Sequence, residues 1–212
     1  SRVVGVDSDW IAACYLELRF YETLNPLGLA QSRIWPYFAG CLDAIEYALG
    51  LREIKGRPVS SYLEPKWMEA GYAVLRDFPR APRSLLSHLW SVALGERKTY
   101  RVLAQQCLLN EPNLLDTVHN ALEDARKSTR VVAAEWLTGI RSPDSIKVLK
   151  KALASEKHDE PKAAMMMALE ALGVDMDQFL NRKKLLEEAQ NILGELPIAN
   201  NQIELNPLLQ NK

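Results

Sequence analysis

Basic side chains gather at three places in the second half of the chain, each a short polar stretch between two apolar ones. The eight basic residues are Arg97, Lys98, Arg101, Arg126, Lys127, Arg130, Lys157 and Lys162. If the three stretches stack on one another, their charges form a stripe along one edge of the molecule. Such a basic stripe could bind phosphate groups or an acidic partner. It is the binding site that the sequence suggests.

A structural interpretation of the same residues competes with the binding site. Between Pro82 and Gly173 the sequence holds 13 Lys/Arg and 11 Asp/Glu residues, so the surplus of positive charge is small. In "RKSTR", which begins at Arg126, we expect a turn and the entrance of a helix. Arg130 would then connect one helical unit to the next. The sequence favours this structural interpretation over anion binding.

Other residue types that could carry chemistry are too scattered to form a site. No histidines show the HExxH spacing and no cysteines the CxxC spacing, so neither a zinc site nor a disulfide framework is indicated. The G-x-S-x-G and P-loop patterns are also absent. The sequence therefore predicts no metal, no cofactor and no catalytic residues, and it favours a protein that is not an enzyme. Cys14, Cys41 and Cys107 are expected to be buried, reduced thiols.

These residues must be positioned by a repeating region between Pro82 and Gly173. Three units begin at Pro82, Pro112 and Pro143, a period of 30 and then 31 residues. Each has an Ala-Leu pair near the end of its first helix, then a polar turn, and then a cation near the start of its second helix. A single helical hairpin cannot bury its apolar face alone, whereas stacked hairpins bury a continuous core. The pattern predicts an all-α fold, an α-solenoid of HEAT-like helical hairpins.

The flanking sequence is expected to be helical as well, because it shows apolar residues at helical spacing and no strand-like alternation. We expect helices over residues 8–24, 34–49 and 61–78, and a last helix over 182–193. The predicted divisions are an N-terminal helical segment (1–80), the HEAT-like repeats (81–173), a C-terminal helix (174–196) and a loose tail (197–212).

Large apolar residues in the repeats are expected to serve mainly in the core. Trp90 and Trp136 follow apolar neighbours at helical positions, which favours packing. Met165, Met166 and Met167 point about 100° apart around one helix, so at least one should be partly exposed. A soft methionine surface could contact a partner helix, although gap-filling in the core is the preferred interpretation.

Two quoted stretches carry a resemblance to a known family. "ALEDARKSTRVVAAEWLTGIRSPDSIKVLKKALASEKHDEPKAAMMMALEALGVDMDQFL" and "RKKLLEEAQNILGELP" resemble the HEAT-like region of bacterial molybdate-metabolism-regulator-like proteins of unknown function, some of which carry a WGR domain. The resemblance covers roughly residues 89–197. It implies a HEAT-like fold and a cation on the second helix of each repeat that bonds to the next repeat. It implies no catalytic residues.

Composition and charge limit the function classes. Apolar residues make up 48% and charged residues 25% of the 212 residues, as in ordinary globular proteins, and the net charge is -1. No apolar stretch is long enough to cross a membrane, and the N-terminus lacks the features of a signal peptide. The sequence therefore predicts a cytoplasmic protein without a membrane partner. Because no initiator Met is present, we expect an artificially shortened chain, a processed chain or a fragment of a longer one.

Two functions from different classes fit these features. The first is a non-catalytic interaction scaffold that binds a protein or peptide. The second is a nucleic-acid enzyme similar to HEAT-like DNA glycosylases, in which Trp90, Trp136, Asp116 and Asp124 would hold damaged DNA. Phosphate contacts dominate the affinity of proteins for DNA, and the repeat region is nearly neutral. A protein or peptide partner is therefore favoured over nucleic acid.

Overall fold

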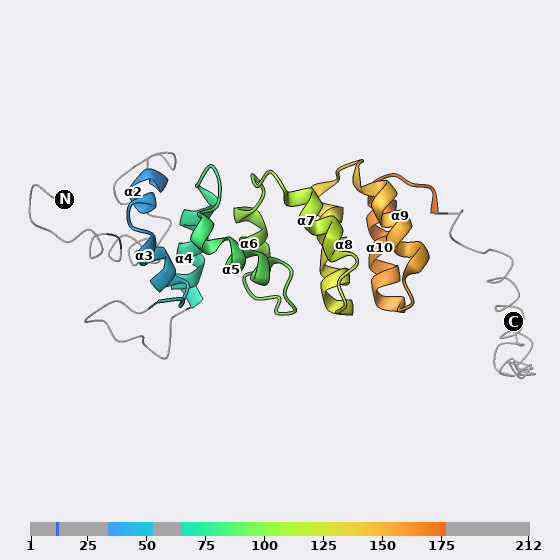
Figure 1. Ribbon diagram of the computed structural model, residues 1–212, viewed down its shortest axis with the longest axis horizontal. Helices are drawn as coiled ribbons and strands as arrows, with labels where there is room; N and C mark the ends of the chain where they lie inside the picture. Colours follow the sequence, from blue (N-terminus) through green and yellow to red (C-terminus); the bar gives the residue numbers. More distant parts are fainter. Residues whose placement is uncertain (1–11, 13–33, 53–64, 177–212) are drawn as a thin grey trace, which may run out of the picture. The chain divides into compact units, whose positions relative to one another are not determined.

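The computed structural model describes Ala12, residues 34–52 and residues 65–176. Within these residues all regular secondary structure is helical and no strand occurs (Figure 1). The all-α prediction is therefore confirmed for the described part of the chain. Contacts divide the chain into two units, residues 1–172 and 173–212, and the helices α2 to α10 all belong to the first. The predicted helices 8–24 and 182–193, the predicted tail and Cys14 lie outside the described residues.

The predicted helix over residues 34–49 is two helices in the structure. They are α2 (Trp35–Ala39) and α3 (Leu42–Ala48), separated by Gly40 and Cys41. Cys41 leaves the helical conformation, with φ −138° and ψ 47°, and its side chain is buried. Its backbone N–H donates to the Phe38 carbonyl oxygen at 3.0 Å, which closes a turn in place of continuous helix. The prediction of one helix was wrong because glycine has low helix propensity and allows this break.

The next helix, α4 (Pro65–Arg76), packs against both the preceding and the following helices. It ends two residues before the predicted end at Phe78, in a turn that leads to Pro79. At Gly71 an added Cβ would lie 3.2 Å from Leu49 Cδ2 and 3.3 Å from Ala48 Cβ. Glycine therefore allows α4 to approach α3 closely. On its other side α4 contacts α6 of the repeat region.

Six helices form three hairpins in the region predicted to repeat. The hairpins are α5 (Arg83–Ala93) with α6 (Arg101–Cys107), α7 (Leu114–Ala121) with α8 (Lys127–Ile140), and α9 (Ser145–Ser155) with α10 (Asp159–Ala171). The turns between the paired helices lie where the sequence pattern predicts them, between each Ala-Leu pair and the following cation. Each pair packs together, and α7 and α8 also contact α9 and α10 (Figure 1).

The three second helices bury equivalent residues. Counting from the cation near each helix start, the residues three, six and seven positions later are buried in all three helices. They are Ala104, Cys107 and Leu108 in α6, Ala133, Trp136 and Leu137 in α8, and Met165, Ala168 and Leu169 in α10. Burial of this shared face removes apolar surface from water, at about 25 cal/mol per Å². The repetition therefore extends from the sequence to the packing.

The remaining core predictions can be compared with side-chain exposure. Cys41 and Cys107 are buried free thiols, as expected, and burial raises the pKa of Cys107 to about 12. Met165 is fully buried while Met167 is 66% exposed, so the prediction of at least one exposed methionine is confirmed. Trp136 is 6% exposed, as predicted, but Trp90 is only half-buried.

Candidate functional site

The eight predicted basic residues all lie at or beside the turns that join the paired helices. Arg97, Lys98 and Arg101 follow α5, Arg126, Lys127 and Arg130 follow α7, and Lys157 and Lys162 follow α9. The structure therefore places them in three equivalent positions of successive hairpins. Whether they form a binding stripe depends on which of them already have polar partners.

Arg101 and Arg130 make the same contacts within their own hairpins. The Nη2 of Arg101 donates to the backbone oxygens of Gly95 and Glu96 at 2.8 and 2.7 Å. The Nη1 of Arg130 donates to those of Asp124 and Ala125 at 2.8 and 3.1 Å. In both cases the acceptors stand six and five residues before the arginine. Each guanidinium therefore satisfies backbone carbonyls of the turn between its paired helices.

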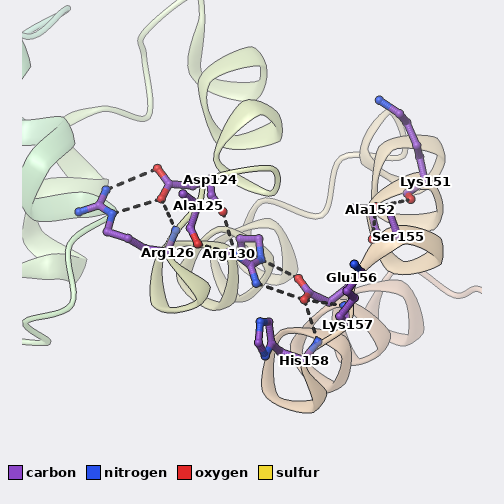
Figure 2. Close-up of polar contacts among 10 residues, drawn as sticks. All are labelled: Asp124, Ala125, Arg126, Arg130, Lys151, Ala152, Ser155, Glu156, Lys157 and His158. Atoms are coloured by element: carbon purple, nitrogen blue, oxygen red, sulfur yellow. Dashed lines mark hydrogen bonds and ion pairs between the residues drawn. The ribbon is translucent and has the colours of Figure 1, made fainter.

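Arg130 also forms the strongest described contact between two hairpins (Figure 2). Its Nε donates to Glu156 Oε2 at 2.6 Å and its Nη2 to Oε1 at 3.1 Å. The two side chains are only 12% and 5% exposed. Glu156 Oε1 also accepts the backbone N–H groups of Lys157 and His158 at 2.8 and 2.9 Å. Hydrogen bonding to Arg130 and these N–H groups lowers the pKa of Glu156 to about 2.

The other two helix-start cations differ from Arg130. The closest carboxylate to Arg101 on the next hairpin is Glu135, at 3.9 Å and with a 60% exposed side chain, and the Arg101 Nε is buried without a partner. The side chain of Lys162 has no hydrogen bond or ion pair with any described residue. Of the three helix-start cations, Arg130 is therefore the one that forms close hydrogen bonds to a carboxylate of the next hairpin.

The remaining cations of the stripe are exposed, and some of them are paired. Arg126 donates to the Asp124 side chain through Nε at 3.2 Å, and this contact lowers the pKa of the Asp124 carboxyl. Lys127 lies 4.0 Å from Glu160. Within the described residues Arg97, Lys98 and Lys157 are exposed and have no ion partner. Free positive charge is therefore scattered rather than continuous along the edge.

An open cleft of about 400 Å³ lies at the Arg130–Glu156 contact (Figure 2). Its lining residues are Leu122, Glu123, Asp124, Arg130, Ala152, Ser155, Glu156, Lys157 and His158. The lining contains three carboxylates, two permanent cations and one histidine. A phosphate would meet repulsion from the carboxylates, and the guanidinium is largely occupied. The cleft therefore offers no concentrated positive charge to an anion.

Of the four residues considered for DNA repair chemistry, three are engaged in other contacts, and Asp116 is exposed on α7. The rings of Trp90 and Trp136 contact each other at a centroid distance of 5.7 Å, and Trp136 is buried. Asp124 is paired with Arg126. In the described residues no group of three or more His, Cys, Asp or Glu could hold a metal ion. His119 contacts the buried Ser145 hydroxyl at 2.9 Å, a contact that joins α7 to α9.

The sequence analysis missed a surface on the outward side of the second helices. One, five and eight positions after the cation, a residue on each of these helices, or just after the end of α6 in the case of Leu109, is partly or fully exposed. We call these nine residues the second-helix face: Val102, Gln106, Leu109, Val131, Glu135, Thr138, Ala163, Met167 and Glu170. Val102, Leu109 and Met167 are 62%, 54% and 66% exposed. Aligning the three second helices at their cations would have revealed this face from sequence alone.

Comparisons with protein-family models, curated proteins and solved structures find no significant match to this chain. The resemblance to the WGR-associated proteins therefore stays a prediction, and residue chemistry has to carry the functional argument. Within the described helices none has both the length and the apolar character needed to cross a membrane.

Proposed function

We propose that this chain is a non-catalytic, HEAT-like scaffold that binds a protein or peptide partner. In this proposal the hairpins α5–α6, α7–α8 and α9–α10 stack as a short α-solenoid. The equivalent buried positions in α6, α8 and α10 support the stacking, as do the contacts of α7 and α8 with the third hairpin. Each hairpin then presents its second helix in the same orientation.

The observation that carries the proposal is the apolar content of the second-helix face. Val102, Leu109 and Met167 are large and exposed. Val102 lies on α6, Leu109 just after the end of α6, and Met167 on α10. Isolated exposed apolar residues are ordinary on protein surfaces, but the first position of this face is apolar in all three hairpins, where it is Val102, Val131 and Ala163. Solenoids use such repeated surfaces for binding.

Catalysis receives less support than binding. The tryptophans are used in packing, Asp124 is paired with Arg126, and the carboxylates at the cleft offset its cations. A DNA glycosylase needs an aromatic side chain with a face open to the flipped base and a surface that attracts phosphate. A scaffold needs neither feature.

Affinity capture from the native cell extract tests the proposal when the bait is varied. The wild-type chain, the double variant Val102→Ser/Met167→Ser and the control Asn120→Ser on α7 would be compared with and without nuclease, at low and high salt. We expect one protein to be retained by wild type and control, resistant to nuclease, and lost with the double variant. Nuclease-sensitive capture that the double variant retains would refute the scaffold and favour nucleic acid.

A further inference from the structure

We propose that the second-helix face docks a basic amphipathic helix of its partner. This inference rests on the proposed function and specifies the chemistry of the partner. Three observations support it. The face carries only negative charge, and its residues are spaced to meet a crossing helix. The cations that have no ion partner among the described residues lie at the turns.

The charge of the face has one sign. None of its nine residues is Lys or Arg, whereas Glu135 and Glu170 are exposed glutamates. The cation closest to Glu135 is Arg101, at 3.9 Å, and its guanidinium already donates to two backbone oxygens. Glu170 has no ion pair with a described residue. The two carboxylates are therefore available to cations of a partner.

The spacing suits a helix that crosses α8 and α10. Positions one, five and eight lie within about 60° of one another around a helix, so each helix offers a narrow strip. Packed helices lie about 10 Å apart, which corresponds to about seven residues of a crossing helix. Apolar residues two turns apart in the partner would then meet Val131 on α8 and the Ala163–Met167 strip on α10. Lysines or arginines beside them would reach Glu135 and Glu170.

The alternatives fit the charges less well. An acidic partner would be attracted to Arg97, Lys98 and Lys157, but these cations lie at the turns and not on the second-helix face. Two copies of the chain that met through this face would bring glutamates of the same sign together, because a twofold interface uses the same patch on both subunits. A basic helix avoids both problems.

Two fluorescent peptides of opposite charge test the inference on the intact chain. Both would be amphipathic helices of about 18 residues with the same leucine face, one with lysine and the other with glutamate on its polar side. Binding would be followed by fluorescence anisotropy at about 50 mM and about 300 mM salt. We expect the lysine peptide to bind at least about 10-fold more tightly than the glutamate peptide, and to weaken at the higher salt.

Variants of the face decide whether that binding is specific. Glu135→Gln and Glu170→Gln should each weaken the lysine peptide about 3-fold, and the control Asp116→Asn on α7 should leave it unchanged. Equal binding of the two peptides, no binding of either, or lysine-peptide binding insensitive to both variants would overturn the inference. Loss of native capture in Val102→Ser/Met167→Ser would still support the scaffold in those cases, so the two proposals fail separately. Thermal unfolding of each variant checks that the fold is retained.

Discussion

Two junctions between successive hairpins are built from the same repeat but are held by different contacts. Between α5–α6 and α7–α8, the rings of Trp90 and Trp136 meet and the Ser128 hydroxyl donates to Glu96 Oε1 at 2.8 Å. Between α7–α8 and α9–α10, α8 packs closely along α10, and Arg130 and Glu156 form a nearly buried pair. The first junction is therefore aromatic, and the second combines close helix packing with an ion pair.

The difference originates in one position of the repeat. The residue six before the second-helix cation is Glu156 in the third hairpin and Asp124 in the second. Glu156 reaches Arg130 of the preceding hairpin, whereas Asp124 bonds to Arg126 in its own turn. Aspartate has one methylene less, and its carboxylate accepts the backbone N–H of Arg126 at 2.8 Å. The cation therefore recurs at the start of each second helix, but a carboxylate of the next hairpin bonds closely to it at the second junction and not at the first.

Removing the indole that joins the first junction should have the largest effect on stability. Trp136→Ala should lower the free energy of unfolding by about 4 kcal/mol, because Trp136 is 6% exposed and its loss leaves a cavity. Trp90→Ala should cost about half as much, since that side chain is half-buried. Urea denaturation measures both changes. Similar losses in the two variants would show that the ring contact, rather than burial of Trp136, stabilises the junction.

Equivalent arginines should differ in their contribution to stability. Arg130→Ala should cost about 3 kcal/mol, because it removes the partner of a nearly buried carboxylate. Arg101→Ala should lower the free energy of unfolding by about 1 kcal/mol. It removes the hydrogen bonds to backbone oxygens, but it also removes a buried Nε that has no partner. Thermal and urea unfolding would be compared with the control Arg126→Ala, whose exposed pair should contribute little to stability. Equal losses at Arg101 and Arg130 would contradict the distinction between the junctions.

Acid should weaken the second junction through Glu156. Its pKa is lowered from 4.5 to about 2 in the folded protein, so its ionised form stabilises the fold fully above about pH 4.5. This contribution is lost as the pH falls from about 4.5 to about 2. At neutral pH Glu156→Gln should lower the free energy of unfolding by about 2 kcal/mol. The difference between the unfolding free energies of the variant and the wild type should shrink toward zero as the pH approaches about 2. Free energies of unfolding across this pH range measure it, and a difference that does not depend on pH would exclude the ion pair as its cause.

The helices of the repeat region could be predicted because their signals are local. Proline starts, helical spacing and polar turns fixed α5 to α10, and the buried positions in the three second helices follow the same period. The predicted helix 34–49 failed because its period continues across Gly40, while the backbone turns there and buries both Phe38 and Cys41. A periodic pattern does not reveal such a break when both sides of it contribute to the same core.

The candidate site was predictable only in part. The sequence placed Arg101, Arg130 and Lys162 near the starts of the second helices, and the structural interpretation of Arg130 is confirmed by its bonds to Glu156 and to its own turn. Which cation finds a carboxylate depends on distances across hairpins, and no spacing within one hairpin contains that information. An exposed methionine was expected, but the rest of the outward face, such as Val102, was not predicted because it appears only when the three second helices are aligned at their cations.

Removing the exposed polar contacts should change stability least, and by similar amounts at the two junctions. Ser128→Ala removes the Glu96 bond of the first junction, and Lys151→Ala removes the 2.8 Å contact with Glu123 across the second. Both contacts are at the surface, where water replaces a lost partner, so each change should lower the free energy of unfolding only slightly. Urea denaturation of the two variants side by side measures the difference. If Ser128→Ala cost more than about 1 kcal/mol beyond Lys151→Ala, polar bonding rather than aromatic packing would hold the first junction. Equal small losses would leave the buried contacts, Trp90–Trp136 in one junction and Arg130–Glu156 in the other, as the source of the difference.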